Sequence, residues 1–266
     1  GPEGKRIILR RGELSLDVAR QSSGHPLLLQ TPSAEVKVLG TQFNVSADVS
    51  TTQLAVHEGL VRVTRLADGK TRDVPADHHV VAALDMKTNF DALPRGESVR
   101  SWKCELQRDV RQGYWQPGAG DGSGSLRAET HLFGGDFGER EDPVLLHSVV
   151  VRPSDSNRTP VLLTAGARLR VAGRLERSCA VSFGFGTHRV RGGRSGKYAL
   201  SRKIELGEQP EGNFEVELSL DEIPRMREGF PESAAGQELG WMWIQTVHED
   251  VGLQVTGVEL IEEQDE

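Results

Sequence analysis

The stretch that decides the fold of the first part of the chain reads AEVKVLGTQFNV and spans residues 34–45. Before Gly40 the apolar side chains hold even positions, as at Val36, and after it they hold odd positions, as at Val45. Side chains of a β-strand alternate between two faces, so a shift of one residue exchanges the face that is buried. We therefore expect a bulge or corner at Gly40, where the strand bends from one sheet layer into the next.

The same shift recurs twice more. Around Gly59 the apolar positions change from even, as at Leu54, to odd, as at Val61, and a third shift accompanies Gly12. Because residues 5–84 show almost no helical period, we expect an all-β unit, built as a roll or a solenoid-like stack of strand–glycine–strand pieces. A flat meander with ordinary hairpins is the alternative.

These residues resemble the FecR domain family. Residues 29–45 read LQTPSAEVKVLGTQFNV and residues 56–63 read VHEGLVRV. The family shows an extended TP-x-A-x-V-x-V-L-GT-x-F-x-V segment followed by V-x-E-G-x-V-x-V. The likeness covers about residues 8–84 and departs from the family at a final corner, where the family usually has a glycine and this chain has Asp77.

The resemblance implies a function in signalling. FecR-like proteins are membrane-anchored regulators of extracytoplasmic-function sigma factors, with a cytoplasmic part that holds the sigma factor and a periplasmic part that receives a signal. It places this chain on the periplasmic or extracellular face of the bacterial inner membrane, with the membrane anchor upstream, and with a membrane or cell-surface protein as partner.

A corner-rich roll offers sheet edges to which a partner can add a strand through main-chain hydrogen bonds. We expect the strands over residues 36–45 and 54–63 to be these edges. The residues that mark them are Val36, Val38, Phe43, Val45, Val61 and Val63.

The rest of the chain divides in two. We expect the FecR-like domain over residues 5–88, a linker with a short helix over 89–125, and a β-sandwich of the jelly-roll type over 126–263. The helix is expected over 99–111, with Trp102 among its apolar positions. The candidate strands of the sandwich are 144–152, 168–175, 180–185, 198–206, 213–220, 239–248 and 252–261. Their pattern loosely resembles galactose-binding-like domains and carbohydrate-binding modules.

Composition limits the partners. The net charge is −7, which argues against a general nucleic-acid binder, because such proteins are usually basic. No apolar run approaches the roughly 18 residues needed to span a bilayer. Aromatic residues make up 5% of the chain. Trp241 and Trp243 share one face of a strand, and we expect them in the core rather than on a sugar-binding platform.

One loop carries a concentration of positive charge. Arg189, Arg191, Arg194 and Lys197 could contact an acidic partner or an anionic glycan. A phosphate-loop interpretation fails, because Arg191 stands where the first glycine belongs and the segment joins two strands.

The sequence shows few motifs that indicate a catalytic site or a cofactor. No HExxH helix or Gly-x-Ser-x-Gly elbow occurs, so we expect no enzyme and no cofactor. The acidic positions Asp136, Glu139, Glu141 and Asp142 are expected to form a charged loop, the alternative being a structural Ca²⁺ site. A hydrolase would need two carboxylates in one groove. Cys104 and Cys179 either form one disulfide or remain two thiols. The sequence thus favours a non-enzymatic FecR-like ectodomain, the alternative being a secreted or cell-surface carbohydrate-binding module with a FecR-like spacer.

Overall fold

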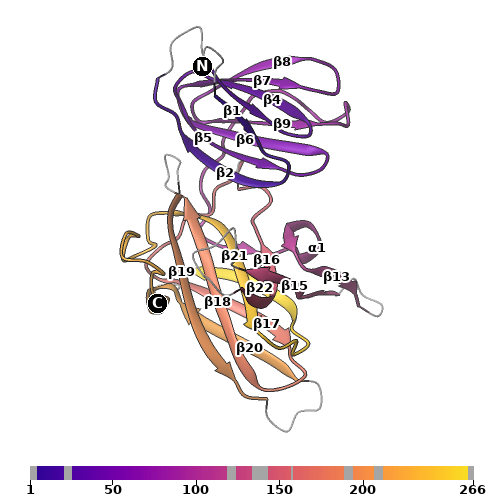
Figure 1. Cartoon of the computed structure of the whole chain (residues 1–266). Coiled ribbons are helices and arrows are strands. Elements are labelled where there is room, and N and C mark those ends of the chain that lie inside the picture. The colour runs from indigo at the N-terminus through magenta and orange to yellow at the C-terminus, as the bar shows by residue number, and fades with distance from the viewer. Residues whose placement is uncertain are drawn as a thin grey trace. The chain divides into compact units, whose positions relative to one another are not determined.

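The structure is a computed structural model that describes residues 5–20, 26–118, 124–133, 143–156, 158–188, 194–206 and 212–262. The chain divides into two compact units (Figure 1). The first contains residues 1–98 together with the short segments 157–160 and 188–194, and the second contains the remainder. The predicted all-β fold is confirmed. In the described part of the chain, helical structure is limited to α1 (Leu106–Asp109) and the 3-10 turn η2 (Leu220–Glu222).

Over the residues that the structure describes, two five-stranded sheets form the first unit. One sheet has the order β1 (Arg6–Ile8), β3 (Leu27–Gln30), β4 (Ala34–Val38), β7 (Leu60–Arg65), β8 (Thr71–Pro75). The other has the order β10 (Leu93–Pro94), β9 (His78–Ala83), β6 (Thr51–Glu58), β5 (Gln42–Ala47), β2 (Gly12–Asp17). Their inward side chains form one core that includes Leu29, Val36, Phe43, Leu54 and Val63.

The predicted glycine corners are the places where the chain changes sheet. Gly40 separates β4 from β5, Gly59 separates β6 from β7, and Gly12 opens β2 after β1. Gly59 has a φ of +85°, and a Cβ built there would lie 2.6 Å from Cγ2 of Thr41. Both the backbone angle and the close neighbour therefore require a residue without a side chain at this corner.

A fourth corner joins β8 to β9 at the position where the chain departs from the FecR pattern. Asp77 adopts a φ of +57° there, and its N–H donates to the carbonyl oxygen of Val56 at 2.9 Å. Asp is one of the few residues other than Gly that tolerate the left-handed region. The corner is therefore kept although the glycine is missing.

Buried hydroxyl groups connect the two sheets near the start of β4. Thr31 Oγ1 and Ser33 Oγ each lie 2.7 Å from Thr52 Oγ1 of β6, and Ser33 Oγ also donates to the carbonyl oxygen of Ala82 in β9 at 2.9 Å. The Thr31 hydroxyl accepts a hydrogen bond from the N–H of Ala34 at 2.9 Å. These bonds satisfy polar groups inside the core and account for the Thr and Ser of the TPSA segment.

The second unit is a sandwich of two sheets, described over the strands named here. One sheet has the order β13 (Tyr114–Pro117), β14 (Gly124–Arg127), β22 (Gln254–Glu262), β17 (Ala167–Arg174), β20 (Asn213–Ser219), with β11 (Trp102–Lys103) paired to β22. The other has the order β12 (Val110–Gln112), β16 (Val144–Val151), β21 (Glu238–Val247), β18 (Cys179–His188), β19 (Arg194–Ile204), with β15 (Glu129–Phe133) paired to β16. Each strand predicted after residue 140 is present.

The predicted linker over residues 89–125 is wrong. β10 pairs with β9 of the first unit, while β11, α1, β12 and β13 belong to the second. The helix expected over 99–111 is reduced to the single turn of α1, because Trp102 and Lys103 pair with β22 and Val110 pairs with β16. Hydrogen bonds of the flanking backbone to neighbouring strands replace the bonds that a longer helix would have made.

The predicted edges for strand addition are also wrong. β4 lies between β3 and β7, β7 between β4 and β8, β5 between β6 and β2, and β6 between β9 and β5. Backbone groups on both sides of these strands are therefore already used in the sheets. The marker residues Val36, Val38, Phe43, Val45, Val61 and Val63 are buried in the core. In the two sheets of the first unit, the outermost described strands are β1, β8, β10 and β2.

We expect the substitution Gly59→Ala to destabilise the first unit by at least about 2 kcal/mol more than Gly69→Ala does. Gly69 also has a positive φ, of +69°, but a Cβ there meets nothing within 4 Å, so it controls for the backbone angle alone. All four tryptophans lie in the second unit. Hydrogen exchange of peptides from β4 to β7 is therefore the appropriate measurement, and equal protection in the two variants would contradict the steric role of this corner.

Candidate ligand-binding face

Alternation along two neighbouring strands decides what the second unit shows to solvent. Phe183 and Phe185 of β18 and Met242 and Ile244 of β21 are buried in the core. The side chains between them must point to the opposite face of the sheet. Trp241 and Trp243 are accordingly only partly buried, in contrast to Met242 beside them.

The prediction that the two tryptophans enter the core is therefore wrong. Trp243 stands opposite Val150 of β16, whereas its neighbour Met242 stands opposite the core residue Val151. Met242 and Ile244 belong to the same buried core as Phe183 and Phe185, and the two indoles lie on the opposite face of the sheet.

Each indole lies against a glycine of the adjacent strand. A Cβ built on Gly184 would lie 2.2 Å from Cζ2 of Trp243, and one built on Gly186 would lie 2.2 Å from Cζ2 of Trp241. The six-membered rings therefore cover the backbone of β18 where a side chain would otherwise stand. Both rings thus lie beside the glycines, on the side of the sheet opposite the core, and are partly buried. We define the tryptophan face as the outward side of this sheet, which carries Trp241, Trp243, Gly184 and Gly186.

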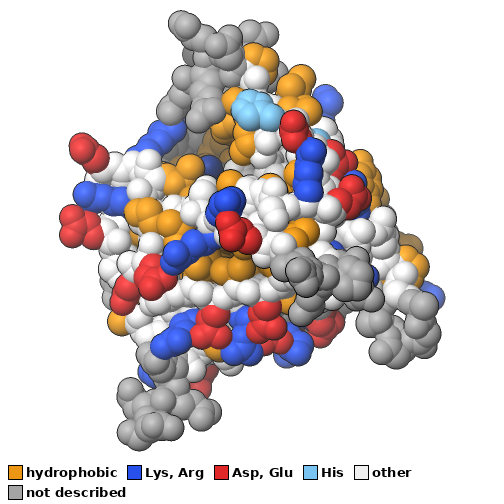
Figure 2. All heavy atoms as spheres, turned by 90° about the horizontal axis from the view of Figure 1, so that it is seen from below, with side chains coloured by type: hydrophobic (Ala, Val, Ile, Leu, Met, Phe, Trp, Pro, Cys, Tyr) orange, Lys and Arg blue, Asp and Glu red, His pale blue; other side chains and the backbone are white. Residues whose placement is uncertain are grey.

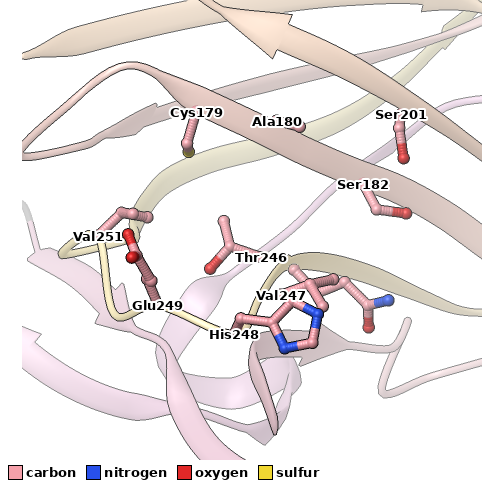
Figure 3. Close-up of a pocket in the computed structure, with 10 residues that line it drawn as sticks. Cys179, Ala180, Ser182, Ser201, Thr246, Val247, His248, Glu249 and Val251 are labelled. Atoms are coloured by element: carbon pink, nitrogen blue, oxygen red, sulfur yellow. The ribbon is translucent and has the colours of Figure 1, made fainter. Parts of the chain in front are cut away.

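A pocket of about 410 Å³ lies at the end of β21 and includes Gln245, the alternate residue after Trp243 (Figure 3). Its volume falls in the range of small-molecule sites. The pocket is lined by Cys179, Ala180, Ser182, Ser201, Gln245, Thr246, Val247, His248, Glu249 and Val251. Figure 3 shows Ser182 and Ser201 on one side of the opening and Glu249 and Val251 on the other.

Several polar groups of this pocket are available for a ligand. Within the described part of the chain, the side chains of Ser182, Ser201 and Gln245 make no hydrogen bond or ion pair, and the indole N–H of Trp243 makes none either. Two hydroxyls and an amide can both donate and accept. A few convergent polar groups beside an aromatic surface are typical of small-molecule binding sites.

The electrostatics of the pocket favour binding over chemistry. Burial raises the pKa of the Cys179 thiol, although nearby Arg177 opposes the shift, so the group is protonated at neutral pH. Glu249 is the carboxylate among the described lining residues, and it is paired with Arg177. The two-carboxylate arrangement of a glycosidase is therefore not found among these residues.

The outward face of the other sheet has a different character. Glu217 of β20 accepts hydrogen bonds from Arg168 and Arg170 of β17, each at 3.0 Å, and Lys103 Nζ lies 2.8 Å from Glu259 of β22. The two arginines hold the pKa of Glu217 below its ordinary value. Figure 2 shows acidic and basic side chains next to one another in a row along one side of the molecule. Such paired charges on an exposed sheet are typical of a solvated surface.

The predicted basic loop is only partly described. Arg189 and Arg191 lie outside the described residues, and Arg194 begins β19 without a described side chain. Lys197 belongs to the tryptophan face, because its Nζ lies 5.9 Å from the centroid of the Trp241 ring. The acidic positions Asp136, Glu139, Glu141 and Asp142 also lie outside the described residues, so a calcium site there stays a prediction.

Three further findings bear on the predictions. Cys104 and Cys179 are free thiols. No group of three or more His, Cys, Asp or Glu side chains suited to a metal ion occurs among the residues that the structure describes. None of the helices in that part of the chain has the length and apolarity needed to cross a membrane.

Part of the first unit is similar to a known protein family. The family model of the FecR protein matches residues 2–62, which confirms the resemblance for this part of the chain. No curated protein sequence matches the chain.

Two solved structures are similar to parts of the chain. A proposed anti-sigma factor from Parabacteroides distasonis is 22% identical over 42% of this chain, with a TM-score of 0.28, and the match spans about half, 51%, of that protein. A family 11 carbohydrate-binding module from Clostridium thermocellum, solved with a β-1,3-1,4-mixed-linked tetrasaccharide, is 12% identical over 64% of this chain and 99% of its own, with a TM-score of 0.37. At these scores the neighbours do not assign a function to this chain.

We expect Gly184→Ala to push the Trp243 indole away from the sheet. The added methyl group occupies the space of the ring, so Trp243 fluorescence shifts to longer wavelength and the free energy of unfolding falls by about 1–3 kcal/mol. Gly229→Ala is the control, because a Cβ there meets nothing within 4 Å. The shift must vanish in a Trp243→Phe background, and an unchanged emission spectrum in Gly184→Ala would show that the ring does not lie on Gly184.

Proposed function

We propose that this chain is the non-enzymatic, extracytoplasmic recognition part of a FecR-like signalling protein that regulates an extracytoplasmic-function sigma factor. The observation that carries this proposal is the FecR match over residues 2–62, in a unit whose corner glycines sit where the chain changes sheet. The second unit supports it, because an aromatic face that ends in a polar pocket offers a place for a signal to bind.

The proposal has consequences for location and partner. The chain acts on the periplasmic or extracellular face of the bacterial inner membrane, held by an anchor upstream, and its partner is a membrane or cell-surface protein. A partner that adds a strand to the first unit would have to use one of the outermost strands, because the inner strands are paired on both sides. β8 is a poor choice, since its outward charges and Pro75 discourage pairing.

We expect deletion of residues 5–262 from the natural gene to change transcripts that depend on one sigma factor by at least several-fold, measured by RNA sequencing in the source bacterium. The Gly59→Val variant, which disrupts a corner of the FecR-like unit, should reproduce the change, and Gly69→Ala should not. A transcript profile that is the same in the wild type, the deletion and Gly59→Val, both with and without envelope stress, would contradict the proposal.

A carbohydrate-binding module with a FecR-like spacer is the second candidate. The outward orientation of Trp241 and Trp243 favours it, since sugar-binding proteins place aromatic rings against the flat faces of pyranoses. Glycan binding by the chain together with an unchanged transcript profile would select this candidate over the first.

A further inference from the structure

We infer that the tryptophan face binds a neutral, extended oligosaccharide whose chain runs along β21, with one sugar unit on the Trp243 indole and the next in the pocket of Ser182, Ser201 and Gln245. The inference names the ligand class of the recognition domain. It rests on the proposed function only in taking the second unit to be that domain.

The spacing of residues along β21 sets the distance between the Trp243 ring, which we call the platform, and the pocket. Trp241, Trp243 and Gln245 are alternate residues of one strand, so their side chains follow one another in steps of roughly 7 Å on the same face. One step is comparable to the length that one pyranose adds to an extended sugar chain. A linear ligand that stacks on Trp243 therefore reaches the pocket with its neighbouring unit.

The chemistry of this face matches a sugar better than a purely apolar ligand. A hydrocarbon placed across Trp243 and the pocket would remove Ser182, Ser201 and Gln245 from water without offering them partners, which is costly. A pyranose has an apolar C–H face that can lie on the indole, and a rim of hydroxyls that can donate to and accept from the pocket groups. Both requirements are met by one molecule.

Other polymers fit less well. β18 and β21 are each paired on both sides, so a peptide finds no free main-chain groups there for strand addition. A nucleic acid needs several phosphate-binding cations, whereas the described residues that line the pocket include no Lys or Arg, their carboxylate Glu249 is paired with Arg177, and the chain has a net charge of −7. The Glu249 carboxylate is already paired with Arg177 and does not need a cationic ligand, so we expect a neutral sugar.

A buried hydroxyl without a partner lies next to Gln245 in the same sheet. Ser148 of β16 stands directly opposite Gln245, is 1% exposed, and its Oγ has no hydrogen-bond partner in the described structure. Buried hydroxyls without partners are uncommon in folded proteins. Opposite residues of paired strands share one face, so the Ser148 hydroxyl stands beside Gln245 without bonding to it, and the Gln245 amide stays available to a ligand.

The test is binding of the chain to neutral tetrasaccharides of extended shape, namely β-1,4-linked gluco-, xylo- and manno-oligosaccharides, followed by isothermal titration calorimetry and NMR shift mapping. Maltotetraose is the control for shape, because its α-linkages coil the chain. We expect at least one extended tetrasaccharide to bind and its constituent monosaccharide to bind at least about tenfold more weakly, since a single sugar unit cannot fill both the Trp243 ring surface and the pocket.

Three variants locate the site. Trp243→Ala should weaken binding by at least about 30-fold, as for a central aromatic anchor, and Gln245→Ala by about tenfold. Trp115→Ala is the matched control, since Trp115 covers Gly124 of the other sheet as Trp243 covers Gly184, and it should leave binding unchanged. Because Gln245 is a partly exposed polar residue, its variant tests the site even if Trp243→Ala fails to fold.

The outcomes separate the two proposals. Absence of binding by all three extended tetrasaccharides, or equal loss in Trp115→Ala and Trp243→Ala, overturns this inference and leaves the sigma-factor proposal to its transcript measurement. Saccharide binding that depends on Trp243 and Gln245 supports the inference whether or not transcription changes. Binding that survives both substitutions would place the ligand elsewhere and would also overturn it.

Discussion

The structure depends on one constraint, which is that a β-strand presents successive side chains to opposite faces. A chain that must bury one apolar face in two successive sheets can do so only by inserting a corner, and the first unit places Gly12, Gly40 and Gly59 where the strands pass from one sheet to the other. In the second unit the same alternation separates Met242 and Ile244, which fill the core, from the two tryptophans that form the opposite face.

The parts of the fold that could be predicted from the sequence are those in which alternation changes phase. The shift at Gly40 is visible because Val36 and Val45 have unambiguous apolar side chains on either side of it. The fourth corner was less clear, since Asp77 occupies the left-handed conformation without the glycine that announces it. The order of the strands within the sheets cannot be predicted from the alternation. The strands over 36–45 and 54–63 look like strong pairing partners because they are central, and central strands have no free edge for a partner.

The orientation of the tryptophans could not be predicted from β21 alone, because both of its alternating sets are apolar. The deciding signal lies in the neighbouring strand, where residues 182–187 read SFGFGT. Phenylalanine and glycine alternate there, so one face supplies core volume and the other leaves empty space. A bulky ring on the adjacent strand can cover that space, and aromatic residues across from glycines commonly do so. The pairing of β18 with β21 is a tertiary fact, however, and no pattern within either strand specifies it.

The two outward faces of the sandwich show why alternation alone does not create a site. Both faces are opposite the same core, but one is occupied by Arg168, Arg170 and Glu217, whose charges satisfy one another. A ligand that covered them would have to displace or desolvate those pairs, which is unfavourable. On the tryptophan face, Ser182, Ser201 and Gln245 have unused hydrogen-bonding capacity beside an exposed ring surface, so a ligand gains contacts there without breaking existing ones. The two sheets therefore differ in how many hydrogen-bonding groups their outward side chains leave unused.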